Sequence, residues 1–180
     1  MIIVGVAVVV LVAGTAFAQI DNGDFENGAA GWNTDVAPDW TVEFLAQGGN
    51  PDGYARIMSP FGDSEGESCI SQEFECGVPG DDTCVISFDY FCRWFDSSEL
   101  TGRVKAYIDG DLEFTSPAEN DIDWTNVTVT VPCGTHTIAL CLEVDPGNNG
   151  WEAGFDNVVA DCESVSSDDE TWSCLKAIYR

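Results

Sequence analysis

The chain has 180 residues, enough for one domain with its own hydrophobic core. Asp and Glu number 32 against 6 Lys and Arg, which gives a formal net charge of −26. This charge repels nucleic acids and anionic lipid surfaces, so it argues against both as partners and indicates a well-hydrated surface.

The first segment, residues 1–18, is an uninterrupted apolar run that ends in Ala16-Phe17-Ala18. An apolar run followed by an A-x-A sequence is typical of a signal peptide, with Gln19 as the first mature residue. No Lys or Arg precedes the run, and its length also suits an uncleaved membrane anchor. The small residues favour cleavage, so we expect a secreted or cell-surface protein with no membrane segment after residue 18.

After the leader, short stretches rich in β-branched and aromatic residues are separated by Gly, Pro, Asn and Asp turns. The predicted strands are Trp40–Leu45, Tyr54–Met58, Cys69–Glu75, Val85–Phe91, Val104–Ile108, Asn126–Val131, Thr137–Val144 and Asn157–Ala160. Asp109-Gly110 predicts a hairpin from Val104–Ile108 to Leu112–Phe114. Many short strands predict an all-β, antiparallel sandwich or barrel, as one domain over residues 19–162.

Cysteines lie at positions 69, 76, 84, 92, 133, 141, 162 and 174, all after the leader. An even number in an exported chain indicates a disulfide-stapled fold, and roughly a hundred connectivities are open. There is no C-x-x-C pair and only one His, so a zinc site is poorly supported. We predict the pair Cys76–Cys84, because the intervening G-V-P-G-D-D-T is a turn sequence that would connect two neighbouring strands.

The end of the chain differs in composition from the rest. Residues 163–170 form an acidic linker, and residues 171–180 predict a short amphipathic helix with Lys176 and Arg180 near its C-terminus. Ten residues make a marginal isolated helix, so we expect it to dock. Its partner is either the body of the protein or the cell envelope, in which case it is a sorting or attachment tail. Cys174 is left to pair with Cys162 or with another chain.

Six short motifs follow one another along the chain: N-G-D-F-E-N-G-A-A-G-W, D-G-Y-A-R-I, C-I-S-Q-E-F, V-I-S-F-D-Y, D-W-T-N-V-T and G-F-D-N-V. In this order they resemble the carbohydrate-binding modules of the CenC-like group (families 4, 9 and 22). The resemblance covers roughly Ile20–Cys162 and implies a galactose-binding-like β-jelly roll. The same pattern occurs in bacterial exported surface proteins, and it specifies the fold much more than the ligand.

The resemblance also implies a structural calcium ion that ties the N-terminal segment to the last strand. Its carboxylates correspond to Glu26 and Asp156, with a further oxygen from Asp52 or its neighbours and a backbone carbonyl near Asp24. Calcium takes six to eight oxygen ligands without strict geometry, so this mixture suits it. The alternative is that these acids are turn residues that face water.

Sugar recognition requires an aromatic ring to stack on and polar groups to hold the hydroxyls. The resemblance assigns Trp32 and Trp124 to packing; Trp40 begins a strand and is expected in the core, and Trp172 is in the tail. The ligand-contact candidates are Trp94, Trp151, Arg93, Phe95 and Arg103. The two arginines are either ion-pair partners or readers of an acidic or hydroxyl-rich ligand.

No pattern of a catalytic centre stands out. The single histidine, His136, enters a strand, and neither G-x-S-x-G nor H-E-x-x-H occurs. We therefore expect an exported, non-catalytic module that binds extracellular polysaccharide or surface glycan. The alternative is a structural cell-surface or matrix protein of the same fold without a sugar site; a glycoside hydrolase is the least favoured reading.

Overall fold

The computed structural model describes residues 20–62, 64–77, 83–94, 102–119, 121–148 and 150–163. The leader, most of the acidic linker, the predicted C-terminal helix and Phe95 lie outside these ranges. Every regular element in the described ranges is a β-strand. None of these residues forms a helix with the length and apolar character needed to cross a membrane.

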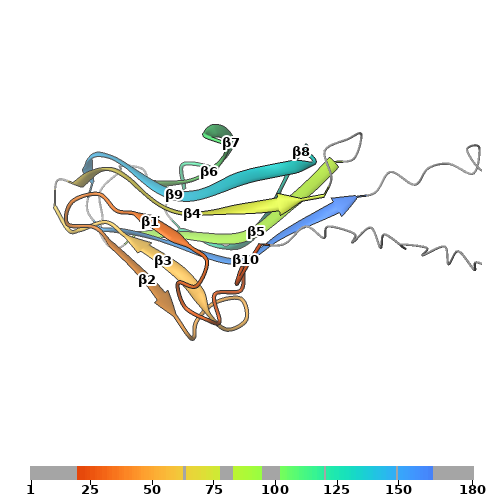
Figure 1. The fold of residues 1–180 in the computed structure, drawn as a ribbon. Helices are drawn as coiled ribbons and strands as arrows, with labels where there is room; N and C mark the ends of the chain where they lie inside the picture. Colours follow the sequence, from red (N-terminus) through yellow and green to blue (C-terminus); the bar gives the residue numbers. More distant parts are fainter. Residues whose placement is uncertain are drawn as a thin grey trace, which may run out of the picture.

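Ten strands form two antiparallel five-stranded sheets, which face each other as a sandwich (Figure 1). The first sheet has the order β1-β4-β9-β6-β7 and the second has the order β2-β3-β10-β5-β8. The strand bounds are β1 Asn33–Asp35, β2 Thr41–Leu45, β3 Tyr54–Met58, β4 Ser64–Cys76, β5 Thr83–Trp94, β6 Gly102–Ile108, β7 Asp111–Thr115, β8 Asp121–Pro132, β9 Gly134–Asn148 and β10 Trp151–Glu163.

The core lies between the sheets and follows from period-two alternation in the sequence. In β9, Ile138, Leu140 and Leu142 are fully buried, and in β5 Ile86 and Phe88 face them from the second sheet. Trp32 and Trp40 also belong to this core, as expected. The two-layer antiparallel sandwich predicted from the sequence is therefore confirmed.

Tyr54–Met58 has its predicted bounds and Trp40–Leu45 differs from β2 by one residue, but several other predicted strands are too short and β1 was missed. β4 and β9 begin or end well outside their apolar cores because they pair along most of their length, from Gly66 opposite Val144 to Cys76 opposite Gly134. Among the described strands, β1 pairs only with β4; its three residues are exposed and carry no hydrophobic alternation from which it could have been predicted. Backbone pairing thus extends the sheets beyond what side-chain patterning reveals.

Two disulfides connect strands within the part of the chain that the structure describes. Cys76 and Cys84 are bonded, as the turn sequence predicts, but they join β4 of the first sheet to β5 of the second and so cross-link the two layers. The second bond, Cys69–Cys141, joins residues directly opposite each other on β4 and β9, with a Cα–Cα distance of 4.1 Å. Its two cysteines are 72 residues apart, and nothing in the sequence singled them out.

Candidate functional site

An open groove of about 600 Å³ lies on the outer face of the first sheet. It is lined by Glu65, Gly66, Glu67, Lys105, Tyr107, Glu143, Val144, Asp145 and Pro146. Alternation along β6 explains why its side chains reach the groove: Val104 and Ala106 are fully buried, so Lys105 and Tyr107 point outward. β4 and β9 add the carboxylates of Glu67 and Glu143.

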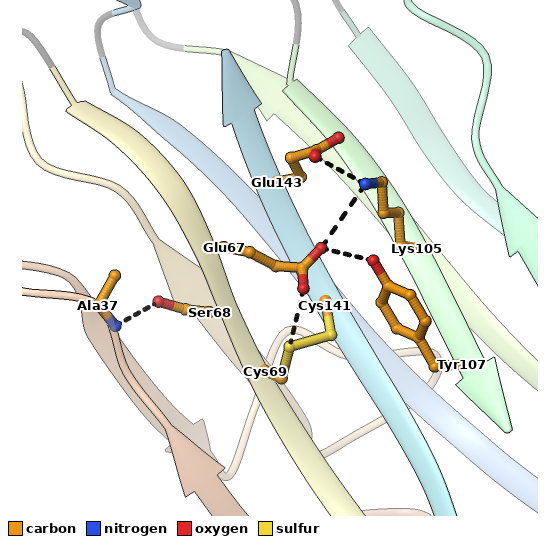
Figure 2. The surroundings of a disulfide bond; sticks show 8 residues. All are labelled: Ala37, Glu67, Ser68, Cys69, Lys105, Tyr107, Cys141 and Glu143. Carbon is orange, nitrogen blue, oxygen red and sulfur yellow. Dashed lines mark hydrogen bonds and ion pairs between the residues drawn. A yellow bond between two sulfur atoms is a disulfide. The ribbon is translucent and has the colours of Figure 1, made fainter. Parts of the chain in front are cut away.

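These side chains form one connected network across three strands (Figure 2). Lys105 Nζ lies 2.6 Å from Glu143 Oε1 and 3.7 Å from Glu67 Oε2. The Tyr107 hydroxyl donates to the same Glu67 oxygen at 2.8 Å. The network holds the tyrosine ring and the carboxylates in fixed positions, which is the preorganisation that a binding surface requires.

The network changes the proton affinities of its members. Burial and the hydrogen bond to Glu67 both raise the pKa of Tyr107. For Lys105, burial disfavours the charged form, but the hydrogen bond and charge of Glu143 outweigh it and raise the pKa. Both groups therefore keep their protons near neutral pH, and the groove offers fixed hydrogen-bond donors among its carboxylate acceptors.

The Cys69–Cys141 disulfide lies beside this network, with Cys69 Sγ 3.8 Å from Glu67 Oε1 (Figure 2). Glu67 and the two cysteines are close enough to resemble a metal site. The disulfide uses both sulfurs, however, so they are not available as thiolate ligands. The bond instead fixes β4 against β9 under the groove.

The predicted ligand residues fall into separate places. Arg103 lies beside the groove, where Nη1 is 3.8 Å from Glu143 Oε2 and 3.4 Å from Asp145 Oδ2. Arg93 lies on the outer face of the other sheet, 4.6 Å above the Phe91 ring and paired with Asp121 and Asp123. The two arginines predicted as ligand contacts thus lie on opposite faces of the sandwich, each in ion pairs.

Trp151 departs from its predicted role. Its ring is fully buried, and Gly102 lies so close that an added Cβ would overlap the indole. The half-buried Trp94 stacks on it at a ring distance of 6.3 Å. Trp151 therefore has no free face for a sugar ring, because its indole lies between the sheets against Gly102.

The outer face of the second sheet carries a different aromatic group. The Trp124 ring meets Phe91 edge-on at 4.8 Å and Tyr54 edge-on at 5.8 Å. Phe91 itself lies across Gly154, where no Cβ would fit. These rings cover one another, which agrees with the packing role expected of Trp124.

The N-terminal segment is tied to both sheets. Gln72, which is buried in β4, accepts from Asp21 N at 2.7 Å and donates to the carbonyls of Asp21 and Gly31. At β10 the register shifts between Asp156 and Val159, and this bulge frees Val158 N to donate to Gly23 O at 2.9 Å. The opening segment is thereby brought beside the last strand.

The loop that precedes β3 contacts both the N-terminal segment and β10, and the predicted calcium ligands converge on this loop. Glu26 Oε1 accepts from Gly53 N at 2.8 Å, and Asp156 Oδ2 accepts from Asn50 N at 2.6 Å. A Cβ at Gly49 would lie 2.7 Å from Asp156 Oδ2, and one at Gly53 would lie 3.3 Å from Asp24 O. Two carboxylates and the Asp24 carbonyl therefore approach the same loop, and we call this arrangement the clasp.

The acids of the clasp have distinct environments. Asp156 is only 1% exposed, and burial raises its pKa, with the charges of Asp89 and Asp24 adding to the effect. Asp24 and Asp52 have exposed side chains; Asp24 caps its own turn, and the Asp52 carbonyl accepts from Gly49 N. A buried carboxylate near other acids and backbone carbonyls fits a hard divalent cation such as calcium. Asp52 is the member for which the geometry offers least support.

His136 has a structural role. Its Nδ1 lies 2.7 Å from Asp109 Oδ2 and its Nε2 lies 2.8 Å from Pro132 O. Both ring nitrogens are thus occupied at the β6–β7 turn and the end of β8, in agreement with the structural role that the sequence favoured.

Comparison with known proteins identifies the fold. No protein-family model matches the chain, and no curated protein sequence matches it significantly. Among solved structures, the K3 cleaved adhesin domain of Lys-gingipain from Porphyromonas gingivalis W83 has 18% identity and a TM-score of 0.56, covering 82% of this chain and 98% of its own. The carbohydrate-binding module TmCBM61, solved with β-1,4-galactotriose, has 14% identity and a TM-score of 0.54, with coverages of 81% and 99%.

A family 4 carbohydrate-binding module is also similar, with 16% identity, a TM-score of 0.50 and coverages of 77% and 99%. The chain has the jelly-roll fold of carbohydrate-binding modules. At these identities the likeness concerns the fold and leaves the ligand to be argued from this chain's own residues.

Proposed function

We propose that the protein is an exported, non-catalytic module that binds extracellular polysaccharide in the groove of the first sheet. The observation that carries this proposal is the groove network, in which Tyr107 lies beside the ion-paired carboxylates of Glu67 and Glu143. The ring offers a surface for the C–H face of a sugar, and the carboxylates accept from its hydroxyls. The fold shared with carbohydrate-binding modules supports the same function.

The proposal includes a structural calcium ion in the clasp. Glu26 and Asp156 would supply carboxylate oxygens, and the Asp24 carbonyl would add a neutral one. The ion would neutralise acids that burial otherwise disfavours and would link the N-terminal segment to β10. Binding free energy gained in this way becomes folding free energy.

A matched pair of arginine variants tests the groove. Arg103→Ala removes a cation beside the groove, and Arg93→Ala makes the same change on the opposite face. In affinity electrophoresis against a panel of soluble polysaccharides, we expect Arg103→Ala and Tyr107→Ala to weaken retardation about tenfold, or roughly 1.4 kcal/mol. Arg93→Ala should bind like the wild type.

If Arg93→Ala weakens binding and Arg103→Ala does not, the sugar binds on the second sheet, and the proposal that it binds in the groove is wrong. If the folded wild-type protein is retarded by no polysaccharide, the binding function itself fails. Circular dichroism of each variant separates lost binding from lost folding.

One observation favours the alternative of a structural surface protein. Tyr107 is the only aromatic ring in the described lining of the groove, and Trp151 is buried. A protein of this kind would bind no glycan and would be attached through its C-terminal tail. The electrophoresis panel distinguishes the two functions directly.

A further inference from the structure

The four edge strands of the sandwich differ in length and charge. β1, β2 and β7 have three, five and five residues, and each contains at least one carboxylate. β8, the remaining edge strand, has twelve residues and no charged side chain from Trp124 to Pro132. Natural proteins keep edge strands short or charged so that they do not pair with other chains, and β8 lacks both protections along its middle.

The sequence of β8 also has the composition of a pairing strand. Val127 and Val129 are half-buried on the core side, while Asn126, Thr128 and Thr130 are exposed on the other. β-branched residues favour extended backbone and pack well across strands. Within the described residues, β8 pairs with β5 alone, so its outer backbone groups face away from the sheet.

We propose that β8 pairs antiparallel with β8 of a second copy of this chain. The net charge of −26 restricts where a second copy could dock, because two such bodies can approach closely only where carboxylates are absent, and the middle of β8 is such a strip. Centred on Thr128, the strand is self-complementary. Val127 faces Val129 of the second copy, Asn126 faces Thr130, and no charged pair is formed.

The resulting interface is two-fold symmetric and joins the two second sheets edge to edge. Backbone hydrogen bonds would supply most of the contact, and the valines would extend the core across the boundary. Because the remaining surfaces repel each other, the dimer is expected to be weak and to be strengthened by salt, which screens that repulsion.

Analytical ultracentrifugation of the purified protein tests this inference, with two matched variants. Thr128→Glu places like charges face to face on the symmetry axis, whereas Thr41→Glu makes the same change on β2, the other edge of the same sheet. We expect a concentration-dependent dimer that is favoured by raising NaCl from 0.05 to about 0.5 M. Thr128→Glu should raise its dissociation constant at least about tenfold, and Thr41→Glu should leave it unchanged.

A monomer at all concentrations and salt conditions would overturn the proposal, as would a dimer sensitive to Thr41→Glu and insensitive to Thr128→Glu. Hydrogen exchange gives an independent reading. Within residues 124–131, the alternate amides that point away from β5 should gain protection as the concentration rises. If these amides are already fully protected in the dilute monomer, another segment of the same chain covers the edge of β8, and the proposal is contradicted.

Discussion

Asp156 accepts a hydrogen bond from the backbone of Asn50 across a sequence separation of 106 residues. It does so while almost fully buried, next to a loop that Glu26 holds from the other side. An ionised carboxylate in this position is disfavoured unless something compensates its charge. The clasp therefore links folding, protonation and the proposed calcium ion.

The titration of Asp156 provides the first prediction. In metal-free protein its pKa lies above the ordinary value of 3.8, chiefly because of burial. The ionised form thus costs stability above the raised pKa, and this cost disappears as the pH falls through it. Calcium should reverse the shift and bring the pKa below 3.8, because a bound cation favours the charged form. Carboxyl-carbon NMR with and without chelator measures both values.

Thermal unfolding complements that measurement. Chelation should lower the Tm by several degrees in the wild type and hardly at all in Glu26→Gln, whereas Glu113→Gln, an exposed acid of β7, should respond like the wild type. An identical pKa and Tm in the two metal states, with metal-free protein verified, would remove the calcium proposal.

The two disulfides should contribute unequally to stability. In the chain-entropy account, closing the loop of separation 72 between Cys69 and Cys141 is worth about 4 kcal/mol, against about 2.5 kcal/mol for separation 8 between Cys76 and Cys84. Paired Cys→Ala variants compared by urea unfolding should show this order. A larger loss for Cys76–Cys84 would indicate that its connection between the sheets matters more than loop entropy.

The close packing of Gly102 against Trp151 leads to a prediction about stability. Gly102→Ala places a methyl group where the indole lies, and overpacking of this kind costs about 1–3 kcal/mol of unfolding free energy. In a Trp151→Leu background the same change should cost much less, because the obstructing ring is gone. Additive effects in this double-mutant cycle would show that the two residues do not meet.

Cys92 should be chemically inert in the folded protein. Its side chain is fully buried, and burial, with a smaller effect of Glu152, raises the pKa of the thiol to about 12. Since the thiolate is the reactive form, iodoacetamide at pH 8 should label it only after unfolding. Peptide mass spectrometry locates the label, and rapid modification of Cys92 in native protein would contradict the buried position.

Much of the fold was predictable because it depends on local patterns. Alternation in Thr137–Val144 indicated a half-buried strand, and the structure places Ile138 and Leu140 in the core. The groove was not predictable in this way. Glu67, Lys105 and Glu143 come from three strands whose adjacency depends on sheet order, and sheet order is not encoded in any one segment.

The clasp was predictable in part, more than the groove and less than the fold. Its residues were named from family resemblance, while their meeting depends on a bulge after Asp156 that no composition signal marks. Trp151 was wrongly predicted as a ligand contact, because its glycine-rich surroundings in the sequence do not distinguish a ring that packs from one that binds. The small size of Gly102, on a strand distant in sequence, is what lets it turn inward.

The position of β10 has a mechanical consequence. It lies in the centre of the second sheet, paired with β3 on one side and, over eleven positions, with β5 on the other. A force applied along the chain beyond Glu163 would load both ladders in shear, with many hydrogen bonds resisting together rather than opening one at a time. A protein held to a surface by its C-terminal end would thus carry tension through a central strand that is paired on both sides.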